Sequence, residues 1–77
     1  MTDETLTMLS DELGKTGSIG FWNNDEWFTI GLRNDGDYEI NIYTSNETDI
    51  NGCYIPQNFV DGGVYGGDCK DAIKFML

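Results

Sequence analysis

The chain has 77 residues, with 14 acidic and four basic side chains, no histidine and a formal net charge of −10. A charge of this size repels nucleic acid and anionic membranes and attracts basic surfaces. Without histidine the chain has no ordinary general base near neutral pH and no imidazole metal ligand. We therefore expect no enzyme activity, metal site or cofactor, and neither nucleic acid nor a membrane as a direct partner.

A chain of this length is expected to fold as one small domain, residues 1–77. Apolar residues make up 39% of the sequence and aromatic residues 13%, which is too much for a disordered acidic tail. The start lacks the basic and apolar segments of a secretory signal, and no apolar run could span a membrane. We expect a cytoplasmic protein in which Cys53 and Cys69 are reduced; a disulfide closing a loop of about 16 residues is the alternative.

The first predicted element is an amphipathic helix over residues 2–13. Leu6, Leu9 and Leu13 recur at helical spacing. Acidic residues at positions 3 and 4 suit a helix N-terminus. Gly14 directly follows the last leucine, which predicts that the helix ends there.

From residue 18 the apolar period changes to two, which predicts strands over residues 18–22, 27–33 and 37–44. The connecting segments are rich in Asn, Asp and Gly, as hairpin turns are, so the strands should form an antiparallel meander. One face of this meander is apolar, and we expect a helix to cover it. The residues of that face are Ile19, Phe21, Phe28, Ile30, Leu32, Tyr38, Ile40 and Ile42.

The other face of the meander carries three large aromatic residues, Trp22, Trp27 and Tyr43. Exposed aromatic side chains mark interaction sites. The alternative is that the second half of the chain folds back over them, because 33 residues follow the third strand and must pack on something.

The rest of the chain has weaker patterns. Residues 53–55 can form a short fourth strand, which Pro56 would end. Residues 61–68 contain four glycines and are expected to form a loop. Asp68 can cap a closing helix over residues 68–77. The expected fold is α+β, with an N-terminal helix, a three-stranded antiparallel meander and a C-terminal helix.

Motifs for chemistry are missing from the sequence. The glycine-rich segment lacks the Gly-Lys-Ser/Thr ending of a phosphate-binding loop. The Asn- and Asp-rich turns lack the twelve-residue pattern of a calcium loop. Two cysteines 16 residues apart cannot make a zinc site alone. A domain this small also leaves little room for a deep cleft, so a small-molecule substrate is not expected.

The spread of acidic residues through the whole chain leads to a functional hypothesis. Carboxylates on a compact scaffold can occupy a basic groove that normally binds phosphate. We expect a small acidic inhibitor that blocks the nucleic-acid-binding surface of its target by charge mimicry. The expected partner-binding residues are Trp22, Asp25, Glu26, Trp27, Asp35, Asp37, Glu39 and Tyr43.

In size, charge and lack of catalytic groups, the chain is similar to phage-encoded inhibitors of bacterial defence, of the anti-CRISPR and anti-restriction types. Immunity proteins that neutralise nucleases share these properties. The likeness does not extend to any sequence motif. A non-catalytic structural or adaptor module, whose charge serves only solubility, is the alternative from another class.

Overall fold

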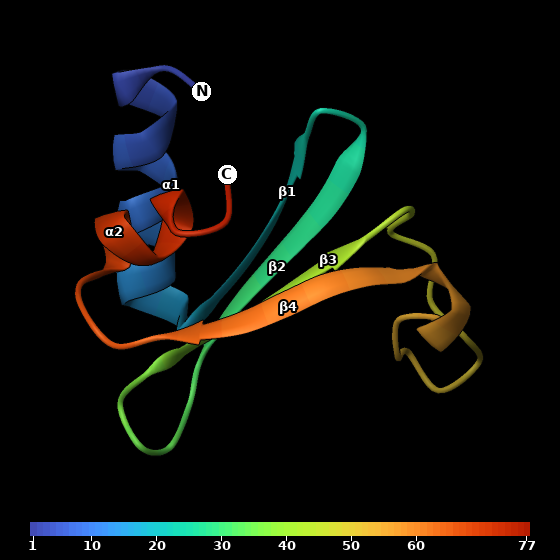
Figure 1. Cartoon of the computed structure of the whole chain (residues 1–77). Coiled ribbons are helices and arrows are strands. Elements are labelled where there is room, and N and C mark those ends of the chain that lie inside the picture. Colours follow the sequence, from blue (N-terminus) through green and yellow to red (C-terminus); the bar gives the residue numbers. More distant parts are fainter.

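The computed structural model describes residues 1–77 and confirms the α+β fold. Its strands form one antiparallel sheet in the order β1-β2-β3-β4. Both helices pack against the same face of this sheet (Figure 1). The elements are α1 (Asp3–Thr16), β1 (Ser18–Asn23), β2 (Glu26–Leu32), β3 (Tyr38–Tyr43), a 3-10 turn (Pro56–Asn58), β4 (Phe59–Tyr65) and α2 (Cys69–Lys74).

Helix α1 continues one turn past the predicted end. Its first turn is capped by Thr2, whose side chain accepts a hydrogen bond from the Thr5 amide at 3.1 Å. The helix ends at Gly17, which has a φ of 83° and donates its N–H to the Leu13 carbonyl. The prediction that Gly14 ends the helix is therefore wrong. Gly17, and not Gly14, has the left-handed backbone conformation that ends the helix, because residues 14–16 remain helical after the last leucine.

The two hairpins use the turn residues in different ways. Asn24 and Asp25 both have positive φ values, 50° and 65°, as a two-residue turn between right-twisted strands requires. The β2–β3 hairpin closes through the Arg33 N–H, which donates to the Asp37 carbonyl at 2.7 Å. Gly36, with a φ of 92°, supplies the left-handed residue of this loop. These turns give the predicted antiparallel meander.

The fourth strand lies where a glycine loop was predicted. Strand β4 pairs with β3, with one register shift opposite Ile42 and Tyr43, so the loop prediction is wrong for residues 61–65 and holds only for residues 66–68. A β-carbon at Gly62 would lie 2.9 Å from Oδ1 of Asn41, and one at Gly63 would lie 3.2 Å from Sδ of Met76. These glycines leave room for neighbouring side chains on the two faces of the sheet. The need for them arises from contacts in the folded protein, so the local sequence does not reveal it.

Residues 53–55 do not form the predicted short fourth strand. They lie in the segment between β3 and β4, which contributes only one isolated bridge, Thr48 with Tyr54. Asp49 organises this segment, because its Oδ1 accepts from the backbone amides of Asn51 and Cys53 at 2.8 and 3.1 Å. The segment therefore has a defined shape although it adds no strand.

The core lies between the sheet and the two helices. Helix α2 is held at its start by Asp68, whose Oδ1 accepts from the Asp71 amide at 2.8 Å, as predicted. Neither helix has the length and apolar character needed to cross a membrane. The ten buried residues are Leu6, Leu13, Phe21, Phe28, Ile30, Tyr38, Ile40, Ile42, Ala72 and Ile73.

Two residues predicted for the apolar face differ from the rest. Ile19 is only partly buried, and Leu32 is 52% exposed. Leu32 is the last residue of β2, where its amide donates to the Gly17 carbonyl. The alternation places it on the correct face, but the strand ends there and the helices leave much of its side chain uncovered.

Tyr38 joins the sheet to α2 through a polar contact inside the core. Its hydroxyl lies 2.9 Å from Sγ of Cys69, which is a free thiol, as is Cys53. The hydrogen bond with the Cys69 thiol raises the pKa of Tyr38 above its ordinary value of 10.0, and burial raises it further. In the folded protein this phenol therefore keeps its proton to higher pH than in the unfolded chain.

This contact predicts a loss of stability in alkali. Above about pH 10 the unfolded chain loses the tyrosine proton while the folded protein still holds it, so the free energy of unfolding should fall as the pH rises. We expect Tyr38→Phe to unfold more easily than the parent near neutral pH and to lose less stability on going from about pH 8 to about pH 10.5. Urea unfolding of both proteins at the two pH values measures this, and equal losses would contradict it.

Candidate functional site

The sheet face opposite the helices, here called the open face, is built from three rows of paired residues. Residues directly opposite each other on neighbouring antiparallel strands point to the same side. The registers therefore place an aromatic row across all four strands, a row of small and polar residues beside it, and a third row beyond. In strand order these rows are Trp22, Trp27, Tyr43 and Phe59; Gly20, Thr29, Asn41 and Gly62; and Ser18, Gly31, Glu39 and Val64.

The aromatic row contains two groups of contacting rings. The rings of Trp22 and Trp27 lie edge to face with centroids 5.2 Å apart. Tyr43 packs against Phe59 at 5.8 Å and is stacked on Tyr54 at 5.0 Å. Such pairs contribute about 0.5–1.5 kcal/mol each beyond the area that they bury, so the row stabilises the sheet as well as presenting apolar surface.

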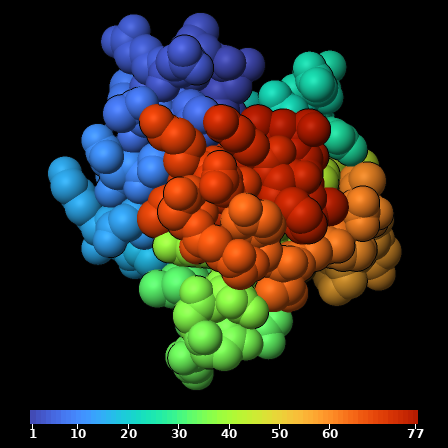
Figure 2. All heavy atoms as spheres, turned by 60° about the vertical axis from the view of Figure 1, so that its left-hand side comes forward, coloured from blue at the N-terminus to red at the C-terminus, as the bar shows by residue number.

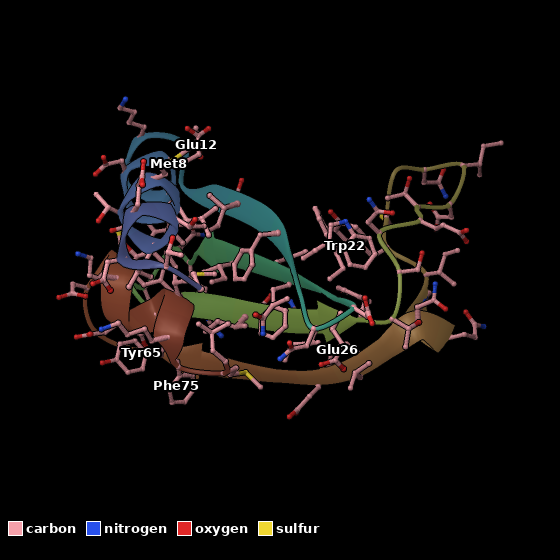
Figure 3. The ribbon with its side chains drawn as sticks, turned by 90° about the horizontal axis from the view of Figure 1, so that it is seen from above. Met8, Glu12, Trp22, Glu26, Tyr65 and Phe75 are labelled. Carbon is pink, nitrogen blue, oxygen red and sulfur yellow. The ribbon has the colours of Figure 1, made fainter.

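The second half of the chain covers this row only in part, and Trp27 and Tyr43 are half-buried. This half adds β4, which supplies Phe59 to the row, to the edge of the sheet and α2 to the helix face, and of the segment between β3 and β4 only Tyr54 is stacked on the row. Trp22 remains 52% exposed and Phe59 49% exposed. Figure 3 shows Trp22 near the β1–β2 turn, away from Tyr65 and Phe75 beside α2. The predicted aromatic residues Trp22, Trp27 and Tyr43 therefore lie together on the open face, with Trp22 exposed and the other two half-buried.

Two members of this surface, Tyr54 and Phe59, were not predicted from the sequence. Tyr54 lies in an irregular segment where no period assigns a face. Phe59 begins a strand that two central glycines conceal. No local pattern marks either residue, because their positions depend on pairing with β3 and on stacking with Tyr43.

Trp27 rests directly on the backbone of Gly20. A β-carbon at Gly20 would overlap the indole ring. Trp27 Nε1 is buried and has no hydrogen-bond partner. The missing side chain at position 20 thus lets the indole lie against the backbone of β1, which is the close approach that a glycine in a strand permits.

We expect Gly20→Ala to lower the free energy of unfolding by about 1–3 kcal/mol, because the added methyl group forces the ring out of place. Gly31→Ala is the matched control: the space above Gly31 holds no atom within 4 Å and its φ is ordinary. It should leave stability unchanged or increase it. Thermal unfolding of the two variants measures the difference, and equal destabilisation would contradict the close contact.

The predicted acidic residues form two groups, not one. Asp25 and Glu26 lie at the β1–β2 turn, and Asp35, Asp37 and Glu39 lie at or beside the β2–β3 loop. These are opposite ends of β2 (Figure 1), a seven-residue strand that spans about 23 Å at about 3.3 Å per residue. The structure therefore brings Asp25 and Glu26 close to the aromatic row and sets Asp35 and Asp37 at the far end of the sheet, with Glu39 at the second position of β3.

The group at the β2–β3 loop includes the single arginine. Arg33 lies 3.3 Å from Asp35 through Nη2 and 3.8 Å from Glu39 through Nη1. Asn41 donates to the other oxygen of Glu39 at 3.4 Å. All three charged side chains are about half exposed, so these pairs contribute little to stability. Figure 2 shows that this loop protrudes from the body of the protein.

The basic residues are distributed unevenly. The three lysines, Lys15, Lys70 and Lys74, all lie on the helices, and Arg33 is the single basic residue of the sheet and its loops. The sheet and its loops therefore carry most of the negative charge. Their acidic residues are Asp25, Glu26, Asp35, Asp37, Glu39, Glu47, Asp49 and Asp61.

The open face also contains a shallow hollow of about 430 Å³ beside the aromatic row. Its lining includes Trp27, Tyr54, Gly31, Glu39 and Asn41. The hollow combines aromatic rings, a small-residue floor and one carboxylate. Nowhere in the protein do three or more histidine, cysteine, aspartate or glutamate residues gather closely enough to hold a metal ion.

Comparison with protein-family models, with curated proteins and with solved structures finds no match to this chain.

Proposed function

We propose that the protein is a non-catalytic inhibitor whose open face binds a basic, nucleic-acid-binding surface of another protein. One observation carries this proposal: a partly exposed aromatic row crosses a sheet whose ends and loops are acidic. Trp22 and Phe59 are each about half exposed. Polar residues at these positions would serve a protein that binds no partner. Large exposed apolar surface rimmed by charge is typical of a protein interaction site.

The arrangement favours a specific role for each residue type. Aromatic side chains near the centre of an interface contribute most of the affinity, because they bury large area and lose little conformational entropy. Charges at the rim mainly accelerate encounter and select a partner of opposite sign. In this proposal Trp22, Trp27 and Tyr43 are anchors, and Asp25 and Glu26 attract the partner from the nearest edge.

This proposal modifies simple charge mimicry. A continuous imitation of a phosphate backbone would need carboxylates in an unbroken line, and the two acidic groups lie at opposite ends of β2. The carboxylates flank an aromatic surface instead. The target surface should therefore combine basic residues with apolar or planar groups, as nucleic-acid channels do where bases stack on aromatic and arginine side chains.

The choice of target class rests on size and charge. A domain of 77 residues with net charge −10 has the properties of phage inhibitors that act on bacterial defence complexes and restriction enzymes. We propose a target of this kind, acting in the bacterial cytoplasm. A structural or adaptor module would use the same aromatic row without needing a basic partner, and partner charge distinguishes the two functions.

Affinity capture from a bacterial lysate, followed by competition, tests the proposal. The tagged protein should retain a nucleic-acid-binding protein that is released by added duplex DNA or RNA, because both occupy the same surface. Retention should weaken steeply between about 50 and about 200 mM salt, since electrostatic attraction is screened.

The control compares the same substitution, phenylalanine to alanine, on the open face and beside the helices. Phe59→Ala removes an exposed aromatic residue of the open face, and Phe75→Ala removes one of equal exposure, 49%, beside α2. Capture should be reduced only by the first. A captured protein that holds this chain and nucleic acid simultaneously, or one with an acidic contact surface, would contradict the proposed inhibitor.

A further inference from the structure

The hollow on the open face has a feature that folding does not explain. Gly31 lies in the interior of β2 with an ordinary backbone conformation, and no atom lies within 4 Å of the position where its β-carbon would be. A glycine inside a strand weakens it, because it packs against nothing and loses more entropy on folding. Gly20, by contrast, is needed to admit Trp27. The vacant space at Gly31 is part of the hollow.

The lining of the hollow has the chemistry that binds an organic cation. Trp27 and Tyr54 supply aromatic rings, and tryptophan is the side chain that attracts cations most strongly through its ring face. Glu39 supplies a carboxylate, and Asn41 donates to one of its oxygens at 3.4 Å. The volume of about 430 Å³ lies at the lower end of the range of about 300–1,000 Å³ for small-ligand pockets, which suits one long side chain.

We propose that this hollow receives a single arginine side chain of the partner, with its guanidinium group against the aromatic rings and hydrogen-bonded to Glu39. The choice of occupant rests on the proposed function, because a basic nucleic-acid-binding surface presents arginines. Arginine is favoured over lysine because its planar group both stacks on aromatic rings and pairs with a carboxylate through two donors.

The protein's own Arg33 shows that a guanidinium can reach Glu39. Their contact is long, 3.8 Å, whereas Arg33 lies closer to Asp35, at 3.3 Å. The guanidinium group of a partner's arginine can therefore pair with Glu39 while Arg33 remains paired with Asp35. In the free protein Arg33 is a competitor for this carboxylate, and its removal should strengthen binding.

Titration with a blocked peptide tests the site without any partner protein. The probe is acetyl-Gly-Arg-Gly-amide, added to the isotope-labelled protein and followed by the NMR signals of the Trp27 indole and the Asn41 side chain. We expect weak but saturable shifts. The same peptide with lysine should bind more weakly, and the peptide with uncharged citrulline should not saturate.

Two pairs of variants separate this site from general electrostatic attraction. Glu39→Gln and Glu47→Gln remove the same charge, and only the first should abolish saturable binding. Arg33→Gln and Lys74→Gln each make the net charge more negative by one, and only the first should tighten binding. Equal effects within either pair would overturn the proposal.

A steric variant keeps the test independent of charge. Gly31→Val fills the hollow from its floor, in a strand where a β-branched residue is favoured. It should fold at least as stably as the parent and bind the arginine peptide about tenfold more weakly or worse, a loss of about 1.4 kcal/mol. Unchanged peptide binding in the folded Gly31→Val protein, or equal binding of the arginine and lysine peptides, would overturn the proposal.

Failure of this inference and failure of the proposed function give different results. If no peptide saturates while lysate capture succeeds, the partner binds without an arginine in the hollow. If the peptide binds and capture fails, the site exists but the inhibitor function is wrong.

Discussion

Ile40→Ala should lower the free energy of unfolding by about 2–5 kcal/mol, the usual loss when a buried isoleucine leaves a cavity. Ile40 is 1% exposed and lies in β3, between β2 and β4 and beneath the helices. A domain of this size has little stability beyond about 5 kcal/mol. The variant should therefore be largely unfolded at room temperature or close to it, as measured by urea unfolding and circular dichroism.

The same substitution elsewhere in the chain is the control. Ile50 is fully exposed, at 101%, in the segment between β3 and β4. Ile50→Ala should change the free energy of unfolding by no more than about 0.5 kcal/mol. Similar effects of the two substitutions would contradict the assignment of the core to the face that carries the helices.

Trp22→Ala should weaken binding of a captured partner by about 30-fold or more. This corresponds to about 2 kcal/mol, the threshold for a residue that dominates an interface. Trp22 is half exposed and its ring contacts Trp27, so its loss should cost the fold much less than the loss of a core residue. Isothermal calorimetry with the captured partner measures the affinity.

Met8→Ala is the control for this variant. Met8 is 66% exposed and projects from α1 away from the sheet (Figure 3). Its removal should leave the affinity unchanged if the partner binds the open face. A loss of affinity in Met8→Ala, combined with normal binding by Trp22→Ala, would move the binding surface to the helices.

Local periodicity accounts for the parts of the fold that were predicted correctly. The alternation from Ile19 to Ile42 separates the two faces of the meander, because side chains in a strand point alternately to either side. The leucine stripe of α1 and the cap at Asp68 are also local signals. They predicted both helices, although α1 ends one turn later than predicted and α2 ends at Lys74, three residues before the predicted end.

The fourth strand could not be predicted from its own residues. Gly62 and Gly63 weaken the strand pattern of β4, and they are there because Asn41 and Met76 approach them from opposite faces. Such requirements arise only after the chain has folded. The same limit applies to the candidate site: the sequence predicted Trp22, Trp27 and Tyr43, but Tyr54 joins them through stacking between distant segments.

The acidic residues show a different limit. The composition gives the number of acidic residues and leads to the expectation of a basic partner. It does not predict how the acidic residues are arranged on the surface. Asp25 and Asp35 occupy turns at opposite ends of β2, since turn chemistry favours aspartate at both places. The pairing of strands therefore divides the acidic residues predicted to bind the partner into two groups and places the aromatic row beside one of them.

The binding surface itself can be mapped directly by NMR cross-saturation of the isotope-labelled protein in complex with its captured partner. We expect signal loss at the open face, strongest for the indole groups of Trp22 and Trp27, with signals from the exposed side of α1 unaffected. Signal loss centred on α1 or α2, with both indoles unaffected, would contradict the account.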